Sequence, residues 1–397
     1  MNYILFDDNT RNNLLPLTFT RPVADIRIGI LTIREKWERT LGAKTSSKTQ
    51  DYLSKKYPAE FAIDTDNVWI NGSVCPNEKL IEEIMSLKPM EVLFDATTVI
   101  AANSGDIKSF EITLTEEFTR YQSHAKALRI ENTWDIFSKN GDAINADFAL
   151  LTAGRTSLAL SSTNQVIGIE NIFVEEGAKV ECAILNASTG PIYIGKDSEI
   201  MEGSVVRGPF ALCEHSTLKL SAKIYGPTTI GPHCKVGGEI NNSVIFGYSN
   251  KAHDGFLGNA VLGEWCNIGA DTNNSNLKNN YSEVKLWNYE KDDFVNTGLT
   301  FCGLIMADHS KCGINTMFNT GTVVGVNANI FGAGFPPNFI PSFSWGGASG
   351  FTTYKIKEAI AVATRVFERR GLVFDETEKD ILTHVFELTE KNNPGIS

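Results

Sequence analysis

Residues 194–212 read IGKDSEIMEGSVVRGPFAL, and the spacing of their apolar residues indicates the fold. An aliphatic residue recurs in it every six positions, at Ile194, Ile200, Val206 and Leu212. A small residue follows four positions after most of these, as Ser198 follows Ile194. A period of six fits neither the 3.6 residues per turn of a helix nor the two-residue repeat of a lone strand. It is typical of a solenoid whose triangular coils each contain three short strands.

The same repeat continues along the chain. It includes Leu218, Ile224, Ile230 and Val236, then Phe256, Leu262 and Ile268, and finally Met306, Cys312, Phe318, Val324 and Ile330. The apolar residue is expected to point into the coil, and the coils must stack to bury it. The period slips by two residues between Val236 and Phe256. It breaks from Asn273 to about Leu299, a stretch too long and polar for one coil, which predicts an extruded loop.

The rest of the chain divides into segments of different character. Its length of 397 residues predicts two domains. Before the repeat, strands alternate with helices, which favours an α/β domain. After it, two amphipathic helices are expected to cap the open end of the solenoid. The predicted segments are residues 1–150 (α/β domain), 151–165 (linker), 166–345 (β-helix) and 346–397 (helical cap).

Composition excludes several functional classes. The net charge of −11 disfavours binding to nucleic acid or to an anionic membrane. No apolar run is long enough to span a bilayer, and the start lacks the pattern of a signal peptide, so we expect a cytoplasmic protein. The seven cysteines form no CxxC pair, which predicts reduced thiols and no metal site.

Together with the repeat, two segments within it resemble a known family. They read KAHDGFLGNA at residues 251–260 and NIGADTNNSN at residues 267–276. The chain resembles the bifunctional uridyltransferase and acetyltransferase that makes UDP-N-acetylglucosamine. It is most similar to a subgroup of sugar nucleotidyltransferases with a hexapeptide-repeat C-terminal domain. The resemblance implies a nucleotidyltransferase-like α/β domain followed by a left-handed parallel β-helix. It also implies a homotrimer with active sites between subunits, and acetyl-CoA or another acyl-CoA as co-substrate.

The resemblance places an acyl-transfer site in the β-helix. Acyl transfer to an amine needs a base and a donor for the oxyanion, roles that His and Asn side chains can fill. His253, four residues before Leu257, matches the family's base, and Asn276 matches its oxyanion-contacting Asn. The break after Thr272 either forms a solvated loop or reaches a neighbouring subunit. Substrate contacts are implied at Asn267, Lys251, Asn241 and Phe256, of which Asn241 and Phe256 replace a Lys and a Tyr of the family.

Residues 7–11 read DDNTR, where the family has a Gly-rich phosphate loop ending in Thr-Arg. The resemblance therefore implies contacts to nucleotide phosphates at Thr10, Arg11 and Arg21, because guanidinium groups bind phosphate well. Asn71 stands where the family has a metal-binding Asp, so Mg²⁺ is a possible cofactor of this domain. The loop's glycines are absent. Nucleotidyl transfer, binding without catalysis and a structural remnant all remain open.

The sequence thus predicts a sugar-phosphate transferase acting on a sugar phosphate and a nucleoside triphosphate. Its N-terminal domain would transfer a nucleotidyl group to a sugar 1-phosphate. Its β-helix would acylate an amino or hydroxyl sugar, in making nucleotide sugars or cell-envelope polysaccharide precursors. The main alternative is a non-catalytic nucleotide-sugar binding or scaffold protein. His309, beside Asp308, is a rival to His253, and a zinc site shared by a trimer is a weaker possibility.

Overall fold

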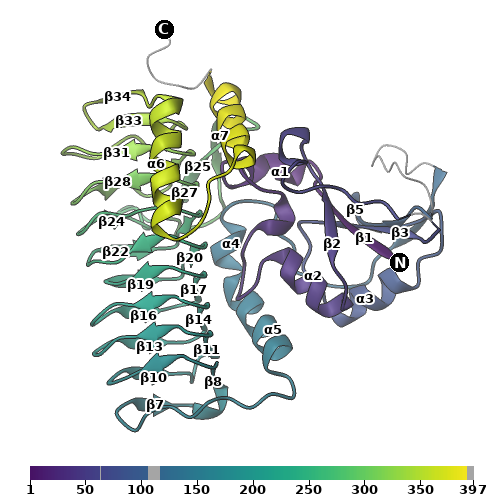
Figure 1. Ribbon diagram of the computed structural model, residues 1–397, viewed down its shortest axis with the longest axis horizontal. Coiled ribbons are helices and arrows are strands. Elements are labelled where there is room, and N and C mark those ends of the chain that lie inside the picture. The colour runs from purple at the N-terminus through teal and green to yellow at the C-terminus, as the bar shows by residue number, and fades with distance from the viewer. Residues whose placement is uncertain (63, 106–116, 391–397) are drawn as a thin grey trace. The chain divides into compact units, whose positions relative to one another are not determined.

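The computed structural model describes residues 1–62, 64–105 and 117–390 (Figure 1). The chain forms two compact units. The N-terminal unit comprises residues 1–14, 20–26 and 31–132, and the β-helix unit comprises residues 15–19, 27–30 and 133–397. The predicted fold class, an α/β domain followed by a left-handed parallel β-helix and C-terminal helices, is confirmed.

The N-terminal unit contains one mixed six-stranded sheet. β1 lies between β2 and β3 and is parallel to both, whereas β5 is antiparallel to its neighbours β3 and β4. Apolar side chains of β1, β3, β4 and β5 form a core on the sheet. The strand order is β2 (Thr45–Lys48), β1 (Asn2–Phe6), β3 (Asn67–Asn71), β5 (Thr98–Asn103), β4 (Glu91–Asp95) and β6 (Thr119–Gln122).

Local sequence signals explain the helices of this unit. Thr32 and Glu35 form a reciprocal capping box at the start of α2 (Ile33–Leu41), and Gly42 ends it with a left-handed φ of 63°. The side chain of Asn77 caps α3 (Glu78–Met85). The described residues of this unit also form α1 (Thr10–Asn13), η2 (Val23–Asp25) and η3 (Asp51–Leu53).

The β-helix has three faces of parallel strands. Face one contains β7 (Gln165–Ile167), β10 (Ile184–Asn186), β13 (Val205–Arg207), β16 (Lys223–Tyr225), β19 (Glu239–Asn241) and β22 (Phe256–Gly258). Face two contains β8 (Ile172–Val174), β11 (Ile192–Ile194), β14 (Phe210–Leu212), β17 (Thr228–Ile230), β20 (Val244–Ile245), β23 (Val261–Leu262), β27 (Leu304–Met306), β30 (Thr322–Val324) and β32 (Phe339–Ile340). Face three contains β9 (Lys179–Val180), β12 (Glu199–Ile200), β15 (Thr217–Leu218), β18 (Lys235–Val236) and β21 (Asn250–Lys251).

The last coils continue the same pattern. Isolated bridges carry face three from Asn250 through Asn267 to Lys311. β28 (Lys311–Cys312), β31 (Asn329–Ile330), β33 (Ser344–Gly347) and the antiparallel β34 (Gly350–Thr353) complete it. β24 (Asn273–Asn274) pairs with β29 (Met317–Phe318). The helical segments η1 (Leu17–Phe19), α4 (Asp135–Ser138), α5 (Asn140–Thr152) and η5 (Ile169–Asn171) also belong to this unit.

The six-residue period follows from the coil geometry. Ile194, Ile200 and Leu212 are at most 1% exposed and form part of one continuous core. The small residue lies just after each corner, where its predecessor adopts a left-handed φ, as Asp197 does at 53° before Ser198. The hydroxyl of Ser198 donates to the carbonyl of Gly195, which satisfies a backbone group that the corner leaves unpaired.

One coil is shorter than the others. Ile230 pairs with Ile245 and Val236 with Lys251, each fifteen residues later, whereas Leu218 pairs with Val236 eighteen residues later. This accounts for the slip in the period. It also places Lys251 at an inward position that aliphatic residues occupy in the preceding coils.

The segment predicted as an extruded loop folds as a hairpin of β25 (Lys285–Asn288) and β26 (Asp293–Asn296). Leu286 is fully buried, and Trp287 stacks on Phe339 with ring centroids 4.2 Å apart. The hairpin therefore packs on the last coils of the same chain and does not form a solvated loop.

The C-terminal helices α6 (Ile356–Arg369) and α7 (Glu376–Leu388) differ from the expected cap. α6 runs along the side of the β-helix (Figure 1), and its Phe367 stacks on Trp265 at 4.0 Å. The antiparallel pair β33–β34 provides the last strands of face three instead. Residues 391–397 of the predicted cap lie outside the described residues. No helix in the described part of the chain is long and apolar enough to cross a membrane.

Candidate functional site

In the N-terminal unit, polar side chains gather at the carboxyl ends of β1 and β3. These strands are parallel neighbours, with Phe6 opposite Asn71. The chain passes from β1 to β2 on one side and then to β3 on the other, so this is a topological switch point. Open α/β sheets bind ligands in the crevice at such a point. Asp8 follows β1 and Asn71 ends β3, so both lie where a ligand is expected.

Asn71 supports Asp8 through its amide nitrogen. Nδ2 of Asn71 lies 2.8 Å from Oδ2 of Asp8 and 3.0 Å from the carbonyl oxygen of Val99. Its Oδ1 accepts hydrogen bonds from the backbone N–H and the hydroxyl of Ser73. Because the nitrogen faces the carboxylate, Asn71 orients Asp8 and does not offer an oxygen to a metal ion beside it.

Arg129 completes the cluster from a distant part of the sequence. Its Nη2 lies 3.0 Å from the hydroxyl of Thr10 and 3.6 Å from Oδ2 of Asp8. Its Nη1 donates to the hydroxyl of Thr98 at 2.9 Å. The sequence interpretation missed Arg129, since no motif surrounds it and only the fold brings it to residues 8–10.

Arg11 and Asp7 are held inside the unit. Nη2 of Arg11 donates to the Tyr52 hydroxyl at 2.8 Å, and its Nε lies 3.6 Å from Oδ2 of Asp7. The Asp7 carboxylate accepts from the N–H of Val23 and the hydroxyl of Thr49. Burial raises the pKa of Asp7 to about 6, against the lowering effect of these partners.

The predicted phosphate-binding residues are mostly buried. Thr10, Arg11, Arg21 and Asn71 are at most 7% exposed, and Thr10, Arg11 and Asn71 bond to protein groups named above. The side chains of the cluster that face solvent are Asp8, 16% exposed, and Arg129, 19% exposed. Glu131, whose Oε1 lies 3.2 Å from Nη1 of Arg129, is 53% exposed. The buried residues thus hold the loop in place, and the surface of the cluster consists of Arg129 and its two carboxylate partners, Asp8 and Glu131.

The cluster does not form a resident magnesium site. Mg²⁺ prefers six oxygen ligands and is usually held by one or two carboxylates together with substrate phosphates. Asp7 is buried, Asn71 presents its nitrogen, and the two accessible carboxylates among the cluster residues described above, Asp8 and Glu131, are each paired with Arg129. No group of three or more His, Cys, Asp or Glu in the described ranges could hold a metal ion.

In the β-helix, His253 is exposed in the turn between β21 and β22. The buried amine of Lys251 donates to the carbonyl oxygens of His253 and Gly237 and so fixes this turn. Burial lowers the pKa of Lys251 to about 8, although the charge of Asp254 opposes the shift. The side chain of Lys251, predicted to contact a substrate, is 1% exposed and points into the coil.

Asn276 and His253 lie at opposite edges of face one, separated by the length of a strand. Its Nδ2 donates to Oδ1 of Asn259 at 2.7 Å, and Asn259 follows β22, whereas His253 precedes it. A three-residue strand is about 10 Å long, so one chain does not bring His253 and Asn276 into contact.

The other predicted substrate residues are divided between two faces. Phe256 and Asn241 lie on face one, half-buried, and the ring of Phe256 covers Gly258, which pairs with Asn241. Asn267 is exposed on face three. The structure therefore does not assemble these residues into one pocket within a single chain.

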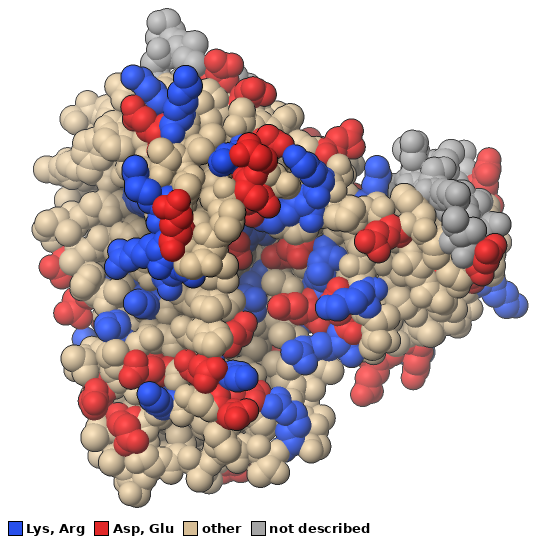
Figure 2. Space-filling model, viewed as in Figure 1, with Lys and Arg blue, Asp and Glu red and all other residues tan. Residues whose placement is uncertain are grey.

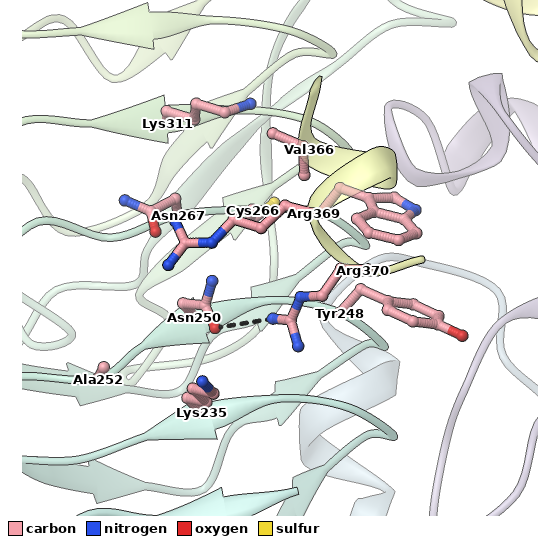
Figure 3. Close-up of a pocket in the computed structure, with 11 residues that line it drawn as sticks. Lys235, Tyr248, Asn250, Ala252, Cys266, Asn267, Lys311, Val366, Arg369 and Arg370 are labelled. Carbon is pink, nitrogen blue, oxygen red and sulfur yellow. Dashed lines mark hydrogen bonds between the residues drawn. The ribbon is translucent and has the colours of Figure 1, made fainter. Parts of the chain in front are cut away.

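A pocket of about 540 Å³ lies on face three beside the end of α6 (Figure 3). Asn267 lines it, next to Asn250, whose Oδ1 accepts a hydrogen bond from Nη2 of Arg370 at 3.3 Å. Lys235, Lys311 and Arg369 also line it. Figure 2 shows basic side chains grouped where the end of α6 meets the β-helix.

The repeat itself could have revealed two of these cations. Lys235 and Lys311 each stand one residue before an inward residue, Val236 and Cys312, so both must point outward on face three. Tyr248 and Trp265 stack at 4.2 Å along a corner beside the pocket, and Phe367 of α6 joins this stack.

The N-terminal part of the chain matches a known protein family. Residues 3–156 match the family model described as sugar nucleotidyl transferase. The match classes the chain as a sugar-related transferase. It agrees with the position of the polar cluster, which lies within the matched residues. No curated protein matches the chain.

Solved structures give weaker likenesses. A UDP-N-acetylglucosamine acyltransferase of Francisella novicida is 12% identical, with 58% of this chain and 88% of that chain covered and a TM-score of 0.26. The corresponding enzyme of Arabidopsis is 14% identical, with 58% and 91% covered and a TM-score of 0.20. The acetyltransferase domain of PglB from Neisseria gonorrhoeae is 11% identical, with 84% and 97% covered and a TM-score of 0.12.

Proposed function

We propose that the N-terminal domain transfers a nucleotidyl group from a nucleoside triphosphate to a sugar 1-phosphate. The observation that carries this proposal is the match of residues 3–156 to the sugar nucleotidyl transferase family. In such a reaction a phosphate oxygen of the sugar 1-phosphate attacks the α-phosphorus of the triphosphate. The bond to the β-phosphate breaks, and pyrophosphate leaves.

The exposed part of the polar cluster supplies the groups that this reaction needs. The charge of the Arg129 guanidinium can stabilise the negative charge that develops on a phosphate, which would compete with Asp8 and Glu131 for it. Asp8 keeps Arg129 oriented at 3.6 Å and is itself held by Asn71. Negative charge at Asp7 and Asp8 opposes a bound triphosphate, so we expect a weaker affinity for triphosphate than a Gly-rich loop gives.

The experiment is a pyrophosphate-release assay on the purified chain. UTP, CTP, GTP and dTTP are each combined with a panel of sugar 1-phosphates in the presence of Mg²⁺. We expect release with at least one pair and a loss of about a hundredfold or more in the rate for Arg129→Gln. Arg39→Gln, which changes an exposed arginine of α2, serves as the matched control and should keep the wild-type rate. No release from any pair would refute the proposal.

A second candidate for this domain is nucleotide-sugar binding without turnover. It is favoured by the burial of Thr10, Arg11 and Asn71, which bond to protein groups and so face away from a ligand. Calorimetry separates the two functions. Tight binding of a nucleotide sugar together with no pyrophosphate release would support this candidate over catalysis.

For the β-helix we propose acyl transfer from an acyl-CoA to an amino or hydroxyl sugar, in a homotrimer. The exposed imidazole of His253, on a turn that Lys251 fixes, is free of hydrogen bonds in the described structure and can act as the base. His253 and Asn276 of one chain lie at opposite edges of face one. In a homotrimer the oxyanion donor would therefore be Asn276 of a neighbouring subunit. The acyl group would leave the CoA sulfur, and the sugar nitrogen or oxygen would gain it and lose a proton.

Release of free thiol from acetyl-CoA in the presence of glucosamine 1-phosphate and related sugars tests this second activity. His253→Ala should abolish it, whereas His215→Ala, at another exposed corner of the β-helix, should not. Equal rates for wild type and His253→Ala would overturn the role of His253. Thiol release and pyrophosphate release are separate readouts, so either activity can fail without the other.

A further inference from the structure

Four cations line the pocket on face three, and they come from two directions (Figure 3). Lys235 and Lys311 belong to the β-helix, and Arg369 and Arg370 to the end of α6. In the described structure none of the four forms an ion pair with a carboxylate, and the lining includes no Asp or Glu. The chain as a whole carries a net charge of −11, so this local excess of positive charge is unusual for it. It favours an anionic ligand.

The side chains from the β-helix form a straight column, which we call the face-three column. Lys235 pairs with Asn250, Asn250 with Asn267, and Asn267 with Lys311. Neighbouring strands lie about 4.8 Å apart, so the two lysines are separated by about 14 Å along the axis, with two amide side chains between them. Such a column offers hydrogen-bond donors over the length of a ligand that carries more than one phosphate.

The arginines of α6 lie over the middle of this column. In Figure 3 the side chain of Arg369 extends towards Asn267, and Arg370 lies beside Asn250, to which it donates a hydrogen bond at 3.3 Å. Guanidinium groups bind phosphate oxygens through two parallel hydrogen bonds, whereas the lysine amines act as point charges. The two kinds of cation together fit a diphosphate group, which has oxygens on two adjacent phosphorus atoms.

The pocket is held in place before any ligand arrives. Phe367 stacks on Trp265 at 4.0 Å, which anchors the end of α6 to a corner of the β-helix. Nζ of Lys311 donates to the carbonyl oxygen of His309 at 2.7 Å. Cations that are already ordered lose little conformational freedom on binding, so the affinity for an anion is greater.

We propose that this pocket binds a small molecule through a diphosphate group, carried by a nucleotide or present as inorganic pyrophosphate. Its volume of about 540 Å³ lies within the range of small-molecule sites and leaves room for a nucleoside beside the diphosphate. The inference does not depend on nucleotidyl transfer, because every residue of the pocket belongs to the β-helix unit.

The test is calorimetric titration of the full-length chain with inorganic pyrophosphate, UDP and coenzyme A, each alone. Lys235→Gln and Arg369→Gln change exposed side chains and should leave the fold intact. Each should weaken binding about tenfold or more, because a charge-assisted hydrogen bond is lost. Lys179→Gln is the matched control. Lys179 lies in the same register three coils earlier, beside Glu199 and outside the pocket, so its change should have no effect.

The three ligands distinguish the two sources of the diphosphate. Tighter binding of UDP or coenzyme A than of pyrophosphate assigns the site to a nucleotide, and equal affinities assign it to the inorganic ion. Arg129→Gln should leave this binding unchanged, which separates it from binding in the N-terminal unit. The proposal is overturned if none of the three ligands binds saturably, or if Lys235→Gln and Arg369→Gln both bind as tightly as wild type.

Discussion

The amide nitrogen of Asn71 lies 2.8 Å from Oδ2 of Asp8 and joins the ends of the parallel strands β1 and β3. This bond determines how the loop after β1 is presented, since the same carboxylate lies 3.6 Å from Arg129. It also changes the interpretation of Asn71, from a substitute for a metal ligand to a support for the Asp8 carboxylate.

Substitution of Asn71 by Asp tests this relationship. If Asn71 supports Asp8, the new carboxylate at position 71 removes the amide donor to Asp8 and repels the Asp8 carboxylate. The free energy of unfolding should therefore fall by about 1–3 kcal/mol. Urea denaturation measures the change, and Asn9→Asp, at the exposed position between Asp8 and Thr10, is the control. Unchanged stability together with faster Mg²⁺-dependent turnover in Asn71→Asp would instead identify a metal ligand.

Asp7 should make the stability of the chain depend on pH. Burial raises its pKa to about 6 in the fold, from 3.8 in the unfolded chain, despite the donors of Val23 and Thr49 and the charge of Arg11. The folded state therefore binds the proton more tightly, and the contribution is fully present below pH 3.8 and lost as pH rises through 6. Relative to Asp7→Asn, the wild type should lose about 2–3 kcal/mol between pH 4 and pH 7.

Denaturation midpoints of the two proteins across that range measure the difference. Asp25 also acts on Asp7 and raises its pKa, so its carboxylate must be kept in both proteins. Parallel pH profiles for wild type and Asp7→Asn would show that Asp7 is not the group responsible.

Lys251 should produce the opposite trend at alkaline pH. Burial lowers its pKa from 10.5 to about 8, while Asp254 and Asp271 act against the shift. The unfolded chain then binds more protons between these values, so stability should rise with pH from 8 to 10.5, by about 3 kcal/mol at most. Lys251→Met should show a smaller rise.

The residual rise in Lys251→Met is expected from Lys311, whose pKa burial also lowers to about 8. The measurement is guanidinium denaturation at closely spaced pH values. A rise of the same size in wild type and Lys251→Met would show that the Lys251 amine is not desolvated in the coil.

Lys311 should couple anion binding to proton uptake. The groups around its amine are the carbonyl of His309 and the thiol of Cys266, whose own pKa burial raises, together with the arginines of α6. A bound diphosphate favours the charged amine, so near pH 8 the complex should take up a fraction of a proton. Calorimetry in two buffers with different ionisation enthalpies measures this. Equal heats in both buffers would contradict it.

The sequence predicted the β-helix well because each inward position is set by a count of residues. Ile194, Ile200 and Leu212 are buried where the six-residue period places them. The inward position of Lys251 was not predicted, because a shortened coil changes which residues pair and the pairing is visible only in the fold. For the same reason Lys251 points into the coil, whereas the pocket cations Lys235 and Lys311 point outward.

The N-terminal cluster was predicted only in part. Thr10, Arg11 and Asn71 do lie near the ends of β1 and β3, since a local motif and the strand order both lead there. Their burial, and the arrival of Arg129 from a distant segment, depend on packing between strands that no spacing in the sequence reveals.

Nucleotidyl transfer by the N-terminal domain is tested by the appearance of a nucleotide sugar in the phosphorus NMR spectrum of a reaction mixture. Full-length protein is incubated with a nucleoside triphosphate, a sugar 1-phosphate and Mg²⁺. We expect paired diphosphate signals of the product, pyrophosphate in equal amount, and neither with Arg129→Gln. An unchanged spectrum for every substrate pair, or identical product formation by wild type and Arg129→Gln, would contradict it.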